Sequence, residues 1–323
     1  MKPLASLSLD LDNKWSYMKT HGDSGWESHP SYLDAAVPRI LDFLKERNLL
    51  ITFFIVGQDA ALDKNKAVLR SIADAGHEIG CHSFNHEPWL HLYSYEKLDD
   101  ELAKAEESIL DATGQKPVGF RGPGFSLSEN TLNVLSKRGY LYDATVFPNV
   151  LNPLARAYMF KTSNLTKEQK EQRKELFGTL NDALRPVKPY KWQLDSATLT
   201  EIPVTTMPIF KIPIHLSYVL YLSNYSKALA IFYFRVAMLM CKLTGTRPSI
   251  LLHPLDFIGA KDAKELAFFP GMQMSVEDKL SVVDKVLKLL AKDYRIVTMK
   301  DHVESVVDDK KLPIRKPRFR TAS

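Results

Sequence analysis

The sequence predicts an α/β protein, a distorted or incomplete (β/α) barrel of seven to eight parallel strands with a helical insertion. Three observations support this prediction. Short β-branched or aromatic runs alternate with amphipathic stretches along most of the chain, and a strand followed by a helix, repeated many times, is typical of a parallel sheet. Capping signals bracket the amphipathic stretches. The length of 323 residues suits one large barrel.

Eight short apolar runs are predicted as strands because they are rich in β-branched or aromatic residues and end at polar residues or turns. In chain order they are residues 4–10, 50–56, 78–82, 118–121, 140–144, 202–205, 250–253 and 295–299. Ser94 precedes a predicted helix at 95–113 that stops at Gly114, and Ser128 precedes one at 129–138 that stops at Gly139. Further helices are predicted at 34–47, 64–75 and 276–292.

One region interrupts this alternation. Between about residue 149 and about residue 247, only the run at 202–205 is predicted as a strand. The region contains a charge-rich predicted helix at 166–182, a proline-interrupted stretch at 185–192 and an apolar segment at 209–243. Because strand signals resume at Ile250 with the same rhythm, we interpret the region as an insertion within a single domain that spans residues 1–309.

The net charge of +5 comes from the end of the chain. Six of the 43 basic residues and none of the 38 acidic residues lie between Lys310 and Ser323, so residues 1–309 are close to neutral. We predict a basic, flexible tail at 310–323, either solvated or resting on an anionic membrane surface. The fold itself shows no basic stripe interleaved with aromatic residues, so nucleic acid is not an expected partner.

The chain is expected to be soluble and cytoplasmic. Its two cysteines, Cys81 and Cys241, are too few for a disulfide framework, which favours a reducing compartment. The first residues reach an acid at Asp10 too early for a secretory signal. No segment has the roughly 18–20 uninterrupted apolar residues of a membrane span.

Two acidic residues end the first predicted strand. Asp10 and Asp12 are two apart, so in extended backbone their side chains project from one face, at the strand end where active sites of parallel α/β proteins gather. Neighbouring carboxylates repel each other unless a cation or a proton lies between them. Taken alone, the pair is also explained by a turn in which the acids satisfy backbone groups.

Two histidines four apart, His82 and His86, follow the third predicted strand. On one helical turn, side chains with this spacing share a face and can bind one ion. Taken alone, they are also explained as hydrogen-bonded structural residues. Together with one acid of the first strand, two imidazoles and a carboxylate form a donor set that suits zinc or a similar divalent ion, with positions left for water.

Two further segments place chemically useful groups after predicted strands. Arg121 can orient a carboxylate, and Gly124 can bring a backbone N–H close to a substrate. His253 ends the apolar run of the seventh predicted strand. Each segment is a weak signal by itself, but their shared position at strand ends indicates one site.

In their order along the chain, these motifs resemble those of the polysaccharide deacetylases with a NodB-homology domain, carbohydrate esterase family 4. Most members have adjacent aspartates followed by glycine, whereas here Leu11 separates the aspartates and Asn13 follows, as in a subgroup with spaced acids. The resemblance covers about residues 4–148 and 249–302. It rests on Asp10 and Asp12, on His82 to His86, on Arg121 to Gly124, on Asp143, and on Leu251 to His253.

The resemblance implies a hydrolase of sugar amides that uses one divalent ion. Asp12, His82 and His86 would hold the ion, with Zn²⁺ favoured and Co²⁺, Ni²⁺, Fe²⁺ or Mn²⁺ as alternatives. Asp10 would be the general base, and His253 would protonate the departing amine. The supporting groups would be Arg121 orienting Asp10, the Gly124 N–H stabilising the oxyanion, and Asp143 or Asp256 tuning His253.

Members of this family act mostly on N-acetylated sugars of secreted polymers or cell walls. For a cytoplasmic chain we predict a free or lipid-linked sugar, with a polyprenyl-phosphate-linked N-acetylhexosamine at the inner face of the plasma membrane as the specific hypothesis. A helix at 218–243 would be apolar almost all round, so it either contacts lipid or packs against the barrel or a dimer partner. The alternatives are hydrolysis of a soluble small-molecule amide and a non-catalytic carbohydrate-binding role.

Overall fold

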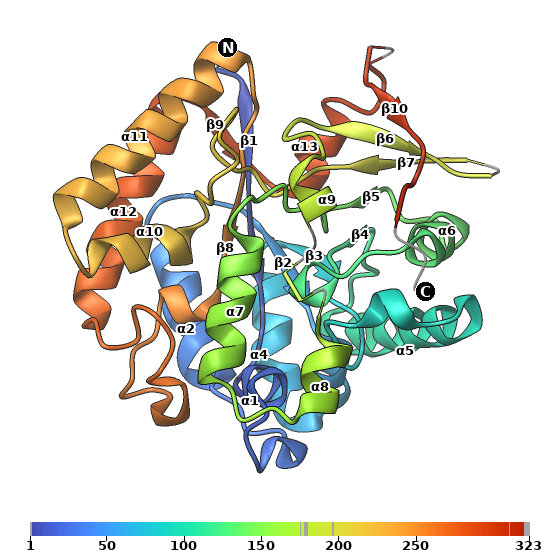
Figure 1. Ribbon diagram of the computed structural model, residues 1–323. Helices are drawn as coiled ribbons and strands as arrows, with labels where there is room; N and C mark the ends of the chain where they lie inside the picture. Colours follow the sequence, from blue (N-terminus) through green and yellow to red (C-terminus); the bar gives the residue numbers. More distant parts are fainter. Residues whose placement is uncertain (1, 175, 178–179, 196, 310, 320–323) are drawn as a thin grey trace.

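Figure 1 shows the computed structural model of the chain, which describes residues 2–174, 176–177, 180–195, 197–309 and 311–319. The strands of this part form one sheet in the order β10-β6-β7-β5-β4-β3-β2-β1-β8, with β9 paired to β1. Their bounds are β1 Leu4–Asp10, β2 Thr52–Ile55, β3 Glu78–Cys81, β4 Gly119–Phe120, β5 Tyr142–Asp143, β6 Tyr190–Gln193, β7 Thr198–Glu201, β8 Ser249–Leu252, β9 Arg295–Val297 and β10 Ile314–Arg315.

The sheet curves into a barrel whose strands are parallel. β1 pairs with β2 on one side and with β8 on the other. The ring closes where the chain after β7 reaches β8, because the N–H of Thr205 donates to the carbonyl of Ser249 (2.9 Å). β1, β2, β3, β4, β5, β7 and β8 therefore form a distorted barrel, as predicted from the alternation of strands and helices. β6 runs antiparallel to β7 and lies outside this ring.

The helices cover the outside of the barrel. Ser94 and Ser128 cap two of them by accepting from the N–H groups of Lys97 and Thr131, and Gly114 ends the first in the left-handed conformation, as predicted. The bounds are α1 Lys14–His21, α2 Leu33–Lys45, α3 Gly57–Ala61, α4 Asp63–Asp74, α5 Tyr95–Thr113, α6 Glu129–Lys137, α7 Asn152–Thr162, α8 Lys167–Gln172, α9 Leu180–Ala183, α10 Leu216–Ser223, α11 Lys227–Thr244, α12 Val276–Asp293 and α13 Met299–Glu304.

The helix α5 illustrates how the helices hold the barrel. Leu98, Leu102, Ala105 and Ile109 recur at helical spacing and are fully buried. Burial of each leucine or isoleucine side chain contributes about 1.5–3 kcal/mol. Glu101 lies on the same buried face, which is an unusual place for a carboxylate and becomes important at the site.

The insertion contains more strands, and more but shorter helices, than the sequence predicts. The strand predicted at 202–205 is wrong in its bounds, because the strand of this segment is β7, which ends at Glu201. β7 pairs with β6 in a hairpin that was not predicted, because prolines at 186 and 189 make its approach look irregular. The predicted helix at 166–182 is wrong for its described part, which forms α8 and α9 separately; residues 175, 178 and 179 lie outside the description. The single apolar helix predicted at 218–243 is also wrong, because Asn224 to Ser226 separate α10 from α11.

Part of the tail predicted to be flexible is paired with the fold. Ile314 and Arg315 form β10, which runs parallel to β6. The Phe319 ring lies against Trp192 with ring centroids 6.1 Å apart, and Arg185 donates to the carbonyl of Arg318. Lys310 and the last four residues of the predicted tail lie outside the described part of the chain.

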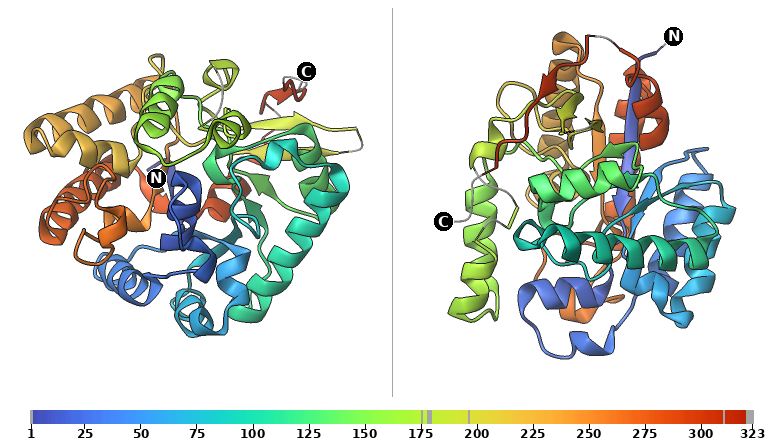
Figure 2. Two further views of the ribbon diagram at one scale, coloured as in Figure 1. Left: turned by 60° about the horizontal axis from the view of Figure 1, so that its bottom comes forward. Right: turned by 90° about the vertical axis from the view of Figure 1, so that its right-hand side faces the viewer.

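Figure 2 shows that α7, α10 and α11 of the insertion lie along one side of the barrel. The helix α11 packs against α12 and against α10, so one face of it is buried. Among the residues that the structure describes, no helix combines the length and the apolar content needed to cross a bilayer.

Candidate active site and metal centre

Three predicted metal ligands meet at the carboxyl end of the barrel. One ligand atom from each of Asp12, His82 and His86 lies within 4.8 Å of those of the other two. The Asp12 Oδ1 atom is 2.9 Å from His86 Nε2 and 3.3 Å from His82 Nε2. All three side chains are buried. Two imidazole nitrogens and one carboxylate oxygen thus converge on one point, as the sequence predicts.

The loop after β3, and not a helical turn, brings the two histidines together. Residues 82–87 are irregular, and Ser83 and His86 have φ angles of +61° and +50°. These left-handed residues turn the chain back so that both imidazoles face Asp12. The expectation of a helical turn is therefore wrong, because a spacing of four does not distinguish a helix from a tightly folded loop.

Two contacts outside the ligand set fix this loop. Glu101 of α5 accepts from the N–H groups of Phe84 (3.0 Å) and Asn85 (2.7 Å) and from the Asn85 side-chain amide. The Nδ1 atom of His82 lies 2.6 Å from the carbonyl of Arg121, which holds its proton there and leaves Nε2 for the site. Glu101 was not predicted to take part in the site. Its position within the apolar stripe of α5 was a signal that this carboxylate has a buried partner.

Asp59 anchors the segment that follows Asp12. Its Oδ1 atom accepts from the Asn13 side chain (2.7 Å), from Trp15 Nε1 (2.9 Å) and from Asn65. Burial raises the pKa of Asp59 to about 7, despite the donors from Asn13 and Trp15. This buried acid ties the start of α1 to α3 and α4, and so fixes the backbone that presents Asp12.

Asp10 forms a buried ion pair with Arg121. The Arg121 Nη1 atom donates to Asp10 Oδ1 (2.7 Å) and to the Ser8 hydroxyl (2.9 Å), and Nε donates to the carbonyl of Ala144 (2.9 Å). The guanidinium also lies over the Phe54 ring at 4.4 Å. Arg121 is completely buried, so it is locked in the position predicted for orienting Asp10.

The charges at this site favour a cation. Burial alone would raise the pKa of Asp12, but His86 and His82 outweigh burial and hold this pKa well below its usual value. Burial alone would lower the pKa of His82, but Asp10 and Asp12 outweigh it and raise this pKa. The two carboxylates therefore stabilise positive charge beside His82, and a divalent ion would meet the same field.

His253 is connected to Asp256 through a residue of the insertion. The His253 Nδ1 atom lies 3.1 Å from the Ser217 hydroxyl, which donates to Asp256 Oδ1 (2.7 Å). Asp256 Oδ2 accepts from the backbone N–H of His253 (2.8 Å). The side chain of His253 is partly exposed, so its ring remains accessible.

Residues 23–142 match the family model described as polysaccharide deacetylase. In this segment the chain is similar to polysaccharide deacetylases. The matched residues include His82, His86 and Arg121, whereas Asp10, Asp12 and His253 lie outside them. The fold thus completes the site from strands on both sides of the match.

A peptidoglycan deacetylase of Helicobacter pylori (strain ATCC 700392 / 26695) is 27% identical over 201 residues, which are 59% of this chain and 66% of that protein. The aligned parts of two other curated relatives span 44% and 37% of their lengths. A structure from Mycobacterium smegmatis described as a polysaccharide deacetylase has a TM-score of 0.66 at 21% identity, covering 99% of this chain and 96% of its own. A similarly described structure from Pseudomonas aeruginosa PAO1 has a TM-score of 0.59 at 16% identity, covering 96% and 92%. At these identities the structures confirm the fold.

The two predicted supporting acids have different surroundings. Asp256 is linked to His253 as described, whereas Asp143 accepts from the Thr145 hydroxyl and interacts with Glu201 in the barrel interior. Burial raises the pKa of Asp143, and burial together with Asp143 raises that of Glu201 well above its usual value. Of the two acids, the structure therefore connects Asp256 and not Asp143 to His253, because β5 directs Asp143 toward β7.

Gly124 lies in the turn Pro123–Phe125 with a left-handed φ of +58°. A Cβ atom at this position would lie 2.7 Å from Pro88 and 2.9 Å from Leu176, so only glycine fits without displacement. Pro88 is two residues beyond His86, which places the turn beside the metal-ligand loop. The role of its N–H in stabilising an oxyanion remains a prediction.

Several aromatic rings lie near the residues of the site. His215 lies at the start of α10, and its ring centroid is 6.3 Å from that of His253. Burial and His253 lower the pKa of His215 to about 3, so this ring is neutral. Trp15 and Trp89 are buried and surround Lys19 together with Trp26. Both rings therefore pack within the fold.

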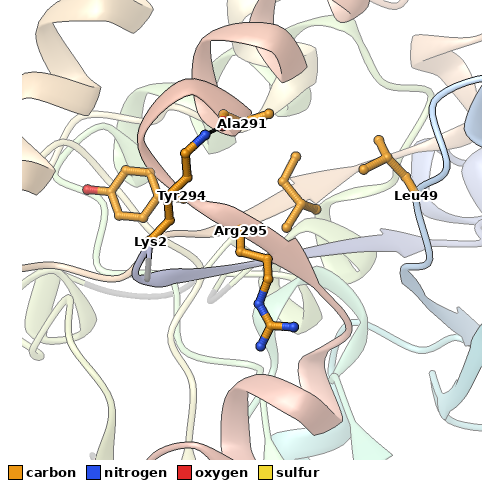
Figure 3. Close-up of a pocket in the computed structure, with 6 residues that line it drawn as sticks. Lys2, Leu49, Ala291, Tyr294 and Arg295 are labelled. Atoms are coloured by element: carbon orange, nitrogen blue, oxygen red, sulfur yellow. Dashed lines mark hydrogen bonds between the residues drawn. The ribbon is translucent and has the colours of Figure 1, made fainter.

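A hollow of about 530 Å³ lies at the opposite end of the barrel (Figure 3). It is lined by Lys2, Leu49, Ala291, Tyr294, Arg295 and Ile296, and the Lys2 ammonium donates to the carbonyl of Ala291 (2.8 Å). It adjoins the amino end of β1, whereas Asp10 ends this strand. In barrels of this kind the chemistry lies at the carboxyl ends, so this hollow is not part of the site.

Proposed function

We propose that this protein is a metal-dependent amide hydrolase that removes the acetyl group from an N-acetylated sugar. The observation that supports it is the meeting of Asp12, His82 and His86 beside the buried pair of Asp10 and Arg121. The match to the polysaccharide deacetylase family model and the name of the Helicobacter pylori relative indicate an N-acetylated sugar as the substrate class.

The residues at the site fit a divalent ion. Both imidazoles turn Nε2 toward one carboxylate oxygen, and the carbonyl of Arg121 holds the proton of His82 on the other ring nitrogen. Two nitrogen ligands and one oxygen ligand suit zinc, which we propose as the metal. When bound, the ion would act as a Lewis acid on the amide carbonyl and would make the attacking water more acidic.

The other residues divide the proton transfers between them. Asp10 accepts the proton of the attacking water, and Arg121 holds Asp10 in one orientation. His253 donates a proton to the departing amine as the C–N bond breaks. The N–H of Gly124 supplies a hydrogen bond to the developing oxyanion. The products are acetate and a free amino sugar.

We further propose that the sugar is lipid-linked and that the insertion rests on the inner face of the plasma membrane. Several elements of the insertion carry large apolar side chains that are exposed. Exposed apolar surface of this kind often marks an interaction site. Ile209 and Phe210 form a tip with 76% and 58% of their surfaces exposed, and the φ of Ile209 is +71°, a strained value for a β-branched residue. The other exposed members are Leu154, Tyr158, Leu184, Tyr221, Tyr225, Leu229, Phe232, Leu239 and Leu243.

Mass spectrometry of candidate sugars tests the proposed reaction. The zinc-loaded protein is expected to lower the mass of a polyprenyl-phosphate-linked N-acetylhexosamine by about 42 Da, because hydrolysis of the amide replaces an acetyl group with hydrogen. This reaction should be faster than the same reaction on the free sugar. Equal rates on the two substrates would contradict the lipid-linked substrate but would still support deacetylation of an N-acetylated sugar. Turnover of non-sugar amides alone would instead support the soluble-amide alternative.

Flotation with vesicles of phosphatidylethanolamine and phosphatidylglycerol tests the membrane surface. The wild-type protein is expected to float with the vesicles, and the double variant Ile209→Asn, Phe210→Ser is expected to bind roughly tenfold more weakly because two apolar side chains no longer enter the lipid. Leu110→Ser with Leu141→Ser is the matched control, since both leucines are exposed elsewhere on the molecule. A wild-type protein that stays wholly in the aqueous fraction would overturn the membrane proposal.

A further inference from the structure

The insertion contributes a polar side chain to the site as well as an apolar surface. α10 begins with Leu216 and Ser217, and Ser217 lies between His253 and Asp256. The three groups form a closed ring, because Asp256 also accepts from the backbone N–H of His253. A serine from an inserted helix thus bridges His253 and Asp256, the last residue of the short helix η4, Pro254–Asp256.

The hydrogen count of this ring fixes where the protons are. A serine hydroxyl has one hydrogen, and Ser217 donates it to Asp256 Oδ1 at 2.7 Å, since an ionised carboxylate has no hydrogen to donate. The oxygen of Ser217 then faces His253 Nδ1 with a lone pair at 3.1 Å, so Nδ1 must carry a hydrogen to make this contact. The backbone N–H of Asp256 donates to the carbonyl of His253 (3.0 Å).

We propose that Ser217 is a positioning residue that holds His253 in the tautomer with hydrogen on Nδ1, and thereby directs Nε2 to the reacting groups. This inference rests on the proposed function, in which His253 protonates the departing amine. The ring then cycles between two states. The imidazolium carries hydrogens on both nitrogens, and after Nε2 has given its proton to the amine nitrogen, the neutral ring keeps the hydrogen on Nδ1.

Other groups around His253 agree with this assignment. The neutral ring of His215 lies beside it, and Lys279 acts on Asp256 while its ammonium donates to the carbonyls of Leu255 and Ile258. Burial raises the pKa of Asp256, whereas the charges of His253 and Lys279 and the hydrogen bonds from the His253 N–H and Ser217 act in the opposite direction and favour the ionised carboxylate. Free imidazole in water favours hydrogen on Nε2, so a stable Nδ1 tautomer requires a partner such as Ser217.

Nitrogen NMR of the zinc-loaded protein labelled with ¹⁵N-histidine tests the proposal without any substrate. The His253 signal is assigned from its loss in His253→Gln. In the wild type at neutral ring charge, hydrogen is expected on Nδ1, and in Ser217→Ala it is expected to move largely to Nε2. Ser217→Thr, which keeps a hydroxyl, should restore the wild-type pattern. Ser223→Ala is the matched control, because Ser223 lies in the same helix and donates to the carbonyl of Leu220.

Kinetics provide a second readout. Ser217→Ala is expected to lower kcat about 10- to 100-fold with KM within about twofold, since only part of the general-acid contribution is lost. The proposal would be overturned if the wild-type spectrum showed hydrogen on Nε2. It would also be overturned if the spectrum of Ser217→Ala were identical to that of the wild type. If no N-acetylated sugar is hydrolysed, the proposed function fails, while the NMR result still decides the tautomer.

Discussion

The Asp10→Asn variant is expected to lose about 10²- to 10⁴-fold in kcat while still binding one zinc ion. That range is the usual contribution of a general base. Asparagine has nearly the shape of aspartate and can still accept the hydrogen bond from Arg121, so the site is expected to remain assembled. It cannot take a proton from the attacking water, however. Steady-state kinetics with metal analysis of the same preparation measure both properties.

His86→Ala is the matched comparison for this variant. It removes an imidazole that contacts Asp12 at 2.9 Å and should therefore lose both the metal and the activity. Asp10→Asn should lose the activity alone. Normal turnover by Asp10→Asn would show that Asp10 is not the base, and loss of its zinc would show that Asp10 is itself a ligand.

The parts of the fold that depend on neighbouring residues were predictable from the sequence. Ser94 and Gly114 bracket α5 at the predicted residues because capping is a local hydrogen-bonding property. Leu4–Asp10 forms β1 because an apolar run of this length between polar residues has few alternatives. The pairing of β10 with β6 was not predictable in this way, since it joins residues that are more than 100 positions apart and is decided by the assembled barrel.

The same distinction applies to the site. The spacing of Asp12, His82 and His86, read with the family resemblance, was sufficient to predict that they meet. Ser217 and His215 gave no signal, because they come from the insertion and approach His253 only after α10 has packed against β8 and η4. The contacts that the insertion makes with the site are set by tertiary structure, and a single sequence does not reveal them.

The hairpin of β6 and β7 shows where a sequence signal was present and was outweighed. Tyr190 and Trp192 are buried, while Lys191 between them is partly exposed, so the period of two typical of a strand is there. Trp192 donates to Glu201 across the hairpin (2.9 Å), and Glu201 in turn interacts with Asp143. The hairpin therefore carries a buried polar network that reaches into the barrel.

Arg121 connects the stability of the barrel with its chemistry. Its guanidinium is completely buried and binds Asp10, Ser8 and the carbonyl of Ala144, so it joins β1 to the ends of β4 and β5. Removal of one partner of a buried ion pair leaves the other charge unpaired and costs about 3–5 kcal/mol. The same residue holds the proposed base, so a loss of folding stability and a loss of activity should occur together.

Arg121→Met is therefore expected to lower the free energy of unfolding by about 3–5 kcal/mol, measured by urea denaturation. Arg70→Met is the control, since Arg70 pairs with Asp74 at the surface and its loss should cost about 1 kcal/mol or less. The double variant Arg121→Met, Asp10→Asn should recover part of the loss, because no unpaired carboxylate is left at that position. Equal costs for the two arginines, or no recovery in the double variant, would mean that the pair with Asp10 does not stabilise the barrel and that Arg121 acts through packing alone.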